Sequence, residues 1–178
     1  SDKMVANQEL DDLCKALGVK TGTQFSLEDI RYGKVIIMTD ADVDGAHIAT
    51  LLMTFFFSEM PELIEKGFLY MASPPLFKLS QGGKYAYALD LEERDKIISN
   101  GIGGNGKVEI SRFKGLGEMN PKQLKETTMD PKNRRLIKVT NSLEHQANNL
   151  IQDLMGKSPE KRFKFIQENA RFADDLDV

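Results

Sequence analysis

The chain has 178 residues, a net charge of −3 and 40% hydrophobic residues. This length and composition predict one globular domain, or one domain with a helical appendage, with enough apolar residues for a sizeable core. The single cysteine, Cys14, excludes an internal disulfide and favours a reducing cytoplasm. No signal peptide is recognisable and no apolar run reaches transmembrane length, so we expect no membrane partner. The chain starts with Ser-Asp-Lys rather than Met, and we expect a piece of a longer protein.

The N-terminal part of the chain alternates between helical and extended patterns. Residues 8–17 have apolar side chains at helical spacing and stop before Gly18, which fits a helix C-cap. After a polar loop, Ser26 and Asp29 have the spacing of a capping box for one short helical turn. The apolar run 35–38 then predicts a buried strand.

The next segment predicts a strand–helix–strand unit. We expect a helix from Ala46 to Met60, with Pro61 bending it or starting a new helix that Gly67 ends. Residues 68–72 predict a second strand, so the two strands should pair in parallel through a right-handed crossover. The apolar side chains of the helix are expected in the core, namely Leu51, Leu52, Phe55 and Phe56.

The second half of the chain predicts further strands and helices. Residues 76–79 and 85–89 should form a hairpin around two glycines. A helix at 91–100 leads into a glycine-rich loop at 101–106, where a phosphate grip is a weak alternative because no helix follows. We then expect a strand at 107–113, a glycine turn, a short helix from Pro121, a strand at 134–139, helices at 143–155 and 159–170, and an extended end at 172–178.

Three aspartates at alternate positions follow the first strand. Asp40, Asp42 and Asp44 are closed by Gly45 and lie at a strand's carboxyl end, where open α/β sheets bind their ligands. Three carboxylates this close together repel one another unless a cation neutralises them. Because carboxylate oxygens are hard ligands, the cluster predicts a Mg²⁺ site.

Three other interpretations compete for this cluster. A calcium-binding EF-hand fits the first six positions but needs a glutamate at the twelfth, where Leu51 stands, and a helix in place of the strand. A phosphatase with an aspartate nucleophile would want a hydroxyl residue where Asp44 stands. A plain turn, with Asp44 capping a helix that begins near Ala46, leaves Asp40 and Asp42 unexplained.

Positive charge is concentrated in one stretch of this acidic chain. Residues 112–138 contain eight Lys or Arg residues against three acids, a local charge of +5, whereas the first thirty residues carry −3. Such a stretch can be a solvated face or can bind a phosphate backbone. The predicted metal cluster favours the second interpretation.

Three long motifs identify a family. They read DADVDGAHIATLLMTFFF, MPELIEKGFLYMASPPLFKL and RFKGLGEMNPKQLKETTMDP. Together they closely resemble the B subunit of bacterial type IIA DNA topoisomerases, a group that comprises the B subunits of topoisomerase IV and of DNA gyrase. The compact span between the motifs favours topoisomerase IV. The resemblance implies an α/β fold, with a Toprim-like parallel sheet flanked by helices over residues 1–140 and a helical or mixed tail over 141–178.

The resemblance also implies function and partners. The family performs ATP-dependent cleavage, passage and religation of double-stranded DNA together with an A subunit in a heterotetramer, which relaxes supercoils and decatenates chromosomes in the bacterial cytoplasm. It implies Mg²⁺ as the cofactor and places ATP in a separate N-terminal domain. We therefore expect DNA and the A subunit as partners of this chain, and no ATP binding.

The family's functional positions carry over onto individual residues of this sequence. The resemblance implies metal binding by Asp40 and Asp42, with Asp44 contributing to a second ion, and DNA contacts by His47 and Arg162. Lys114, which has two glycines beside it, and Arg112 are the DNA-binding candidates of the basic stretch. The family also needs a glutamate in an EGDS motif on an earlier strand, and a tyrosine of the A subunit; the motif does not occur in this chain. We therefore expect the piece by itself to be inactive. A non-catalytic scaffold and a free-standing Mg²⁺-dependent phosphohydrolase are the other hypotheses.

Overall fold

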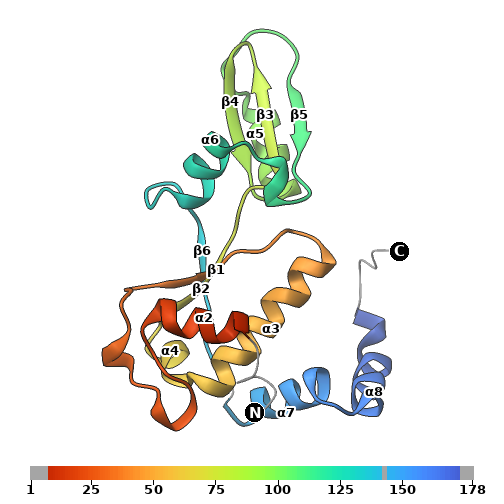
Figure 1. The fold of residues 1–178 in the computed structure, drawn as a ribbon. Coiled ribbons are helices and arrows are strands. Elements are labelled where there is room, and N and C mark those ends of the chain that lie inside the picture. Colours follow the sequence, from red (N-terminus) through yellow and green to blue (C-terminus); the bar gives the residue numbers. More distant parts are fainter. Residues whose placement is uncertain (1–7, 142–143, 173–178) are drawn as a thin grey trace.

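Two three-stranded sheets organise the molecule, each in its own lobe (Figure 1). The computed structural model describes residues 8–141 and 144–172. The first sheet has the order β1-β2-β6 and the second has the order β4-β3-β5. This mixture of helices and small sheets confirms the predicted α/β class, although parallel pairing is confined to one pair of the described strands.

The first lobe contains the predicted strand–helix–strand unit. Strand β1 (Val35–Ile37) pairs in parallel with β2 (Leu69–Ala72), and helices α3 (Val43–Glu59) and α4 (Pro61–Glu65) form the crossover between them. Strand β6 (Leu136–Lys138) returns from far along the chain and pairs antiparallel with the other edge of β2. In the described residues β1 is therefore an edge strand with one open side.

Helix α2 (Gln8–Leu17) and the two crossover helices supply the core of this lobe. Helix α2 ends as predicted at Gly18, whose positive φ of 82° suits a glycine, and the Gly18 amide donates to the Cys14 carbonyl at 2.9 Å. Two short 3-10 turns follow, η1 (Gly22–Gln24) and η2 (Leu27–Asp29). The predicted capping box is wrong, because the Ser26 side chain makes no capping hydrogen bond.

Helix α3 differs from its prediction in the residue at which it begins and in which of its side chains are buried. It begins at Val43, because Asp42 caps it: Asp42 Oδ1 accepts a hydrogen bond from the Gly45 amide at 2.7 Å. The interpretation that Asp44 caps the helix is therefore wrong. Phe55 and Phe56 are buried as predicted, but Leu51 is 48% exposed and does not belong to the core. Periodicity over this almost wholly apolar helix cannot distinguish its faces.

The second lobe is built on the predicted hairpin. Strands β3 (Phe77–Gln81) and β4 (Lys84–Ala88) turn through Gly82 and Gly83, which have φ values of 56° and 82°, as a type I′ turn requires. Strand β5 (Glu109–Arg112) pairs with the other edge of β3. The core is small and consists of Phe77, Leu79 and Ala88, with partly buried side chains from helix α5 (Leu91–Asn100) and its surroundings.

The glycine-rich loop 101–106 folds against the tip of this hairpin. A Cβ atom at Gly104 would lie 1.9 Å from the Gln81 carbonyl oxygen, and one at Gly82 would lie 2.7 Å from the Asn105 backbone. The Gln81 side chain also donates to the Gly106 carbonyl at 2.7 Å. Close backbone packing therefore accounts for these glycines, and a phosphate grip is not needed to explain them.

The chain returns to the first lobe through a series of short helices. These are η3 (Leu116–Glu118), α6 (Pro121–Leu124), and η4 (Lys125–Met129), which has π-helical hydrogen bonding. A capping box between Asn120 and Gln123 starts α6. At the joint between the lobes, the Ser73 amide donates to the Arg135 carbonyl at 3.0 Å, and the Arg135 guanidinium pairs with Glu93 of α5 at 2.7 Å.

The C-terminal part consists of helices α7 (Glu144–Met155) and α8 (Pro159–Asn169) and the 3-10 turn η5 (Ala170–Phe172). Helix α7 contacts α3 and α8, so this part extends from the first lobe (Figure 1). The predicted helix start at Leu143 and most of the predicted extended end lie outside the described residues. The domain boundary at residue 140 remains a prediction. Within the described ranges, no helix is both long and apolar enough to cross a membrane.

Truncation of two side chains on α3 should separate its buried face from its exposed face. Phe56→Ala should lower the free energy of unfolding by about 3–5 kcal/mol, because the ring is 1% exposed in the first core. Leu51→Ala on the exposed face should change it by no more than about 0.5 kcal/mol. Denaturant unfolding measures both values, and a Leu51→Ala loss as large as that of Phe56→Ala would show that α3 packs differently.

Candidate functional site

The three predicted aspartates line one hollow in the surface. We call residues 40–45 the acidic turn, which leads from the carboxyl end of β1 into α3. Asp40, Asp42 and Asp44 surround a hollow of about 460 Å³ whose other walls include Ile48 and Leu116. All three aspartates are solvent-exposed, so the hollow is open to a large ligand.

The backbone of the acidic turn can fold this way only with a glycine at its end. Gly45 is buried, and a Cβ atom there would lie 2.1 Å from the Asp40 carbonyl oxygen. Any side chain would push the first turn of α3 away from the end of β1. Because Asp42 also caps the helix through the Gly45 amide, Asp40 and Asp42 are held by the same few backbone atoms.

The predicted glycine turn at 114–117 closes over Asp40. The Leu116 amide donates a hydrogen bond to Asp40 Oδ1 at 2.7 Å, across 76 positions of sequence. A Cβ atom at Gly115 would lie 2.9 Å from Asp40 Cγ, so glycine permits the close approach. Sequence reasoning singled out Lys114 and its two neighbouring glycines but left open what the backbone approaches. In the structure it approaches the carboxylate of the candidate metal site.

The acidic turn offers carboxylate oxygens for a cation, although it does not form a complete cage. Asp40 and Asp42 each use Oδ1 in a hydrogen bond to a backbone amide, which fixes the carboxylate and leaves its second oxygen for a ligand. Across the described ranges, no three His, Cys, Asp or Glu side chains are close enough together to hold one ion. Mg²⁺ commonly binds through one or two carboxylates and keeps several waters, so this pair fits Mg²⁺ with a mostly hydrated shell.

The fold rules out the EF-hand interpretation. A strand, β1, enters the acidic turn where an EF-hand has a helix. Leu51, at the position of the twelfth ligand, lies on the exposed face of α3 and has no oxygen in its side chain.

The residues predicted to contact DNA occupy three parts of the molecule. His47 is exposed near the start of α3, two residues after the acidic turn. Lys114 is exposed in the glycine turn, and its backbone amide donates to Glu118 Oε2 at 2.7 Å. Arg112 is exposed at the end of β5, two residues before Lys114. The structure therefore places the glycine turn beside Asp40, whereas His47 is not among the residues that line the hollow.

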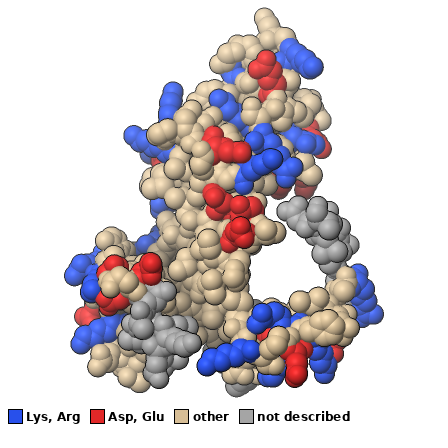
Figure 2. All heavy atoms as spheres, turned by 45° about the vertical axis from the view of Figure 1, so that its right-hand side comes forward, with Lys and Arg blue, Asp and Glu red and all other residues tan. Residues whose placement is uncertain are grey.

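Arg162 stands apart from these residues. It lies on α8, where its guanidinium donates to the Gly156 carbonyl at 2.9 Å and so supports the end of α7. On the face shown in Figure 2, acidic side chains gather where the two lobes meet, and basic side chains gather above them on the second lobe. A polyanion that reaches the acidic side chains on this face would therefore pass close to positive charge.

Comparisons with known proteins agree with this arrangement. Residues 3–74 match the family model described as the Toprim domain, and residues 105–167 match the model described as the DNA gyrase B subunit, carboxyl terminus. The Toprim match includes the acidic turn, and the second match includes the glycine turn. Toprim domains bind Mg²⁺ as a family. The two motifs that meet at Asp40 thus come from two different family models.

Curated relatives match nearly the whole chain. The B subunit of DNA topoisomerase 4 is 54% identical in Bartonella bacilliformis and 55% identical in Caulobacter vibrioides, each over 99% of this chain and 26% of the relative. The B subunit of DNA gyrase from Treponema denticola is 49% identical over 99% of this chain and 27% of the relative. The chain therefore spans about a quarter of the length of the curated relatives it matches.

Two glycines in the same turn provide a matched test of this site. Gly115→Ala should displace the Asp40 carboxylate and weaken its bond to Leu116, with a loss of about 1–3 kcal/mol in unfolding free energy. Gly117→Ala should be close to neutral, because no atom lies within 4 Å of the place that its Cβ would take. NMR shifts of the Leu116 amide and denaturant unfolding would measure both effects. Equal, small effects for the two variants would contradict the close approach at Asp40.

Proposed function

Because the chain belongs to the B-subunit family of bacterial type IIA DNA topoisomerases, we propose that it supplies the Mg²⁺-binding, DNA-facing part of the B subunit of a topoisomerase 4. The observation that carries this proposal is the hydrogen bond from the Leu116 amide to Asp40, which joins the family's two motifs into one site. The higher identity to topoisomerase 4 subunits than to a gyrase subunit supports the first branch of the family.

Asp40 and Asp42 are the proposed ligands of the ion. Backbone amides fix both carboxylates, and each keeps an oxygen toward the hollow. Asp44, at the start of α3, borders the same hollow and would contribute to a second ion. Bound Mg²⁺ would supply charge stabilisation at a DNA phosphate and at the leaving ribose oxygen. The protein's own contribution is to hold the two carboxylates in place and to bring positive side chains beside them.

We propose that another part of the assembled protein completes the site. The family's EGDS glutamate has no counterpart in this sequence, and two or three carboxylates on one turn cannot fill an octahedral shell. Strand β1 carries the acidic turn at its end and, in the part of the chain that the structure describes, has an open edge. A strand added in parallel at that edge would bring its own carboxyl end next to Asp40. By itself the chain would therefore act as a scaffold rather than as a catalyst.

DNA is the proposed partner of the surface around the acidic turn. Lys114 is exposed in the glycine turn that contacts Asp40, and His47 is exposed near the start of the helix that follows the acidic turn, so we propose that a phosphate near Asp40 would meet both. Arg112 extends this positive surface along β5. Arg162 would contact DNA only where the duplex also passes α8.

The assembled enzyme would contain a second kind of subunit. We propose a heterotetramer with the A subunit, whose tyrosine would attack the DNA backbone, and a location in the bacterial cytoplasm. The assembly would cleave, pass and religate double-stranded DNA, with relaxation and decatenation as the outcome. As the family resemblance implies, ATP would bind and be hydrolysed in a separate N-terminal domain of the parent protein; this sequence contains no Walker-type loop.

Removing a single charge from the acidic turn should test the metal site without disturbing the fold. Asp42→Asn keeps a capping oxygen for α3 but removes one negative charge, so Mg²⁺ should bind about tenfold more weakly at an unchanged melting temperature. Asp29→Asn, outside the hollow, is the matched control. Titration with Mg²⁺ monitored by NMR gives both affinities. Identical Mg²⁺ affinities for Asp42→Asn and Asp29→Asn would remove Asp42 from the ligand set.

Lysine and histidine substitutions in the assembled A–B enzyme should separate DNA binding from cleavage. Lys114→Ala should weaken binding to all DNA sequences about equally and lower the salt slope by about 0.9, the effect of losing one phosphate contact. Lys96→Ala on α5, where the lysine pairs with Glu92, is the control. His47→Ala should reduce cleavage more than binding if its ring lies near the scissile phosphate. Unchanged cleavage in His47→Ala, with cleavage abolished in Asp40→Ala, would make His47 a bystander.

A further inference from the structure

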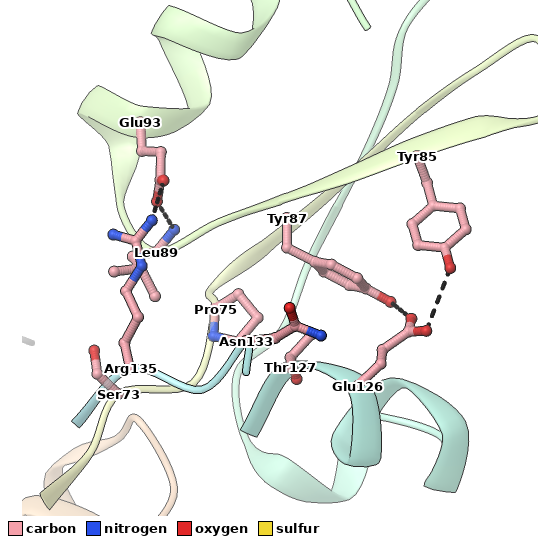
Figure 3. Close-up of a pocket in the computed structure, with 10 residues that line it drawn as sticks. All are labelled: Ser73, Pro75, Tyr85, Tyr87, Leu89, Glu93, Glu126, Thr127, Asn133 and Arg135. Carbon is pink, nitrogen blue, oxygen red and sulfur yellow. Dashed lines mark hydrogen bonds and ion pairs between the residues drawn. The ribbon is translucent and has the colours of Figure 1, made fainter. Parts of the chain in front are cut away.

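A second cavity, of about 350 Å³, lies at the joint between the two lobes. Figure 3 shows it between strand β4, the π-helical turn η4 and the chain that leads into β6. Its walls include Tyr85, Tyr87, Glu126, Asn133 and Arg135. It shares no lining residue with the hollow at the acidic turn, so the proposed metal and DNA site does not account for it.

Glu126 is the anionic group of this cavity. Tyr87 donates its hydroxyl to Glu126 Oε1 at 2.5 Å, and Tyr85 donates to Oε2 at 3.3 Å (Figure 3). Within the described ranges, no ion pair includes Glu126. Two neutral hydroxyls therefore orient the carboxylate without neutralising its charge. Because a carboxylate has about four lone-pair sites, it can still accept further hydrogen bonds.

Tyr87 remains a neutral donor, and both tyrosines present aromatic rings beside this charge. Burial, and then the hydrogen bond to Glu126, raises the pKa of the Tyr87 hydroxyl, so Tyr87 keeps its proton at physiological pH. The two rings meet edge to face with centroids 5.6 Å apart. Lys78 Nζ lies 5.2 Å from the centroid of the Tyr85 ring, so this ring already attracts one cation of the chain.

The other end of the cavity carries a positive charge. Arg135 is paired with Glu93 at 2.7 Å, but its side chain is 60% exposed and its five donors are not all used by one carboxylate. A ligand would therefore meet an uncompensated carboxylate with aromatic neighbours at one end and a guanidinium at the other (Figure 3). A planar organic cation fits the end at Glu126. The rest of such a ligand, if neutral or acidic, fits the end at Arg135.

We propose that this cavity binds a guanidinium group, with Glu126 as its counter-ion and the Tyr85 and Tyr87 rings beside it. A guanidinium can donate two parallel hydrogen bonds to a carboxylate and can stack on an aromatic ring, which a compact ammonium does less well. The group could belong to an arginine side chain of a protein partner or to a free small molecule. A cavity of this size admits one such side chain, or a ligand of similar bulk.

The test uses the full chain and three small probes. N-acetyl-arginine-N-methylamide mimics an arginine within a peptide, free arginine mimics a small metabolite, and N-acetyl-citrulline-N-methylamide has the same shape without the charge. Titration monitored through the ring protons of Tyr85 and Tyr87 should give a dissociation constant of about 1 mM for at least one guanidinium probe, as expected for so small a ligand. The citrulline probe should bind at least about tenfold more weakly. If N-acetyl-arginine-N-methylamide binds more tightly than free arginine, the ligand is an arginine of a protein partner. If free arginine binds more tightly, the ligand is a small molecule.

Three substitutions test whether Glu126 is the counter-ion. Glu126→Gln keeps an acceptor for Tyr87 but removes the charge, and should weaken guanidinium binding about tenfold; Glu109→Gln, exposed on β5, should leave binding unchanged. Tyr87→Phe keeps both the ring and the carboxylate, and should retain binding within about threefold even if Glu126→Gln fails to fold. No binding by either guanidinium probe, equal binding of the citrulline probe, or full binding in Glu126→Gln would overturn the proposal. None of these measurements involves DNA or Mg²⁺.

Discussion

The hydrogen bond between the Leu116 amide and Asp40 is the constraint on which the rest of this site depends. It joins the end of β1 in the first lobe to the turn that follows β5 in the second, and the absence of a side chain at Gly115 allows the approach. The bond fixes the Asp40 carboxylate and positions the exposed Lys114 two residues away. Because this contact links the two lobes, it determines how far the proposed metal ligands lie from the positive surface around them.

The sequence predicted local elements well because their signals are local. Alternating polarity and paired glycines located the hairpin of β3 and β4, and apolar spacing located α2 with its end at Gly18. The parallel pairing of β1 with β2 followed from the strand–helix–strand order, because a helical crossover joins parallel strands. The exposed side of α3 could not be predicted, because nearly every position of that helix is apolar and burial depends on tertiary neighbours.

The site was predictable in its parts and not in its assembly. Three alternating aspartates after a strand indicated a metal site, and two glycines beside Lys114 indicated a close backbone approach. Nothing in the local sequence shows that Leu116 meets Asp40, because the contact joins positions 76 residues apart and depends on both lobes. The cap of α3 is Asp42 rather than Asp44, which the sequence could not show, since both residues are suitable caps and only the backbone geometry distinguishes them.

The open edge of β1 also affects how the chain would behave in solution. An unpaired strand edge presents a row of backbone donors and acceptors that can pair with another chain, and natural proteins usually cover or charge such edges. In the described residues β1 is short and is followed by the acidic turn, so two copies that paired in parallel at this edge would bring their aspartates together. Repulsion between these carboxylates would oppose self-association at low salt, and screening by salt or neutralisation by a divalent cation would weaken that protection. The carboxylates proposed to bind the metal would thus also oppose pairing at the open edge of β1.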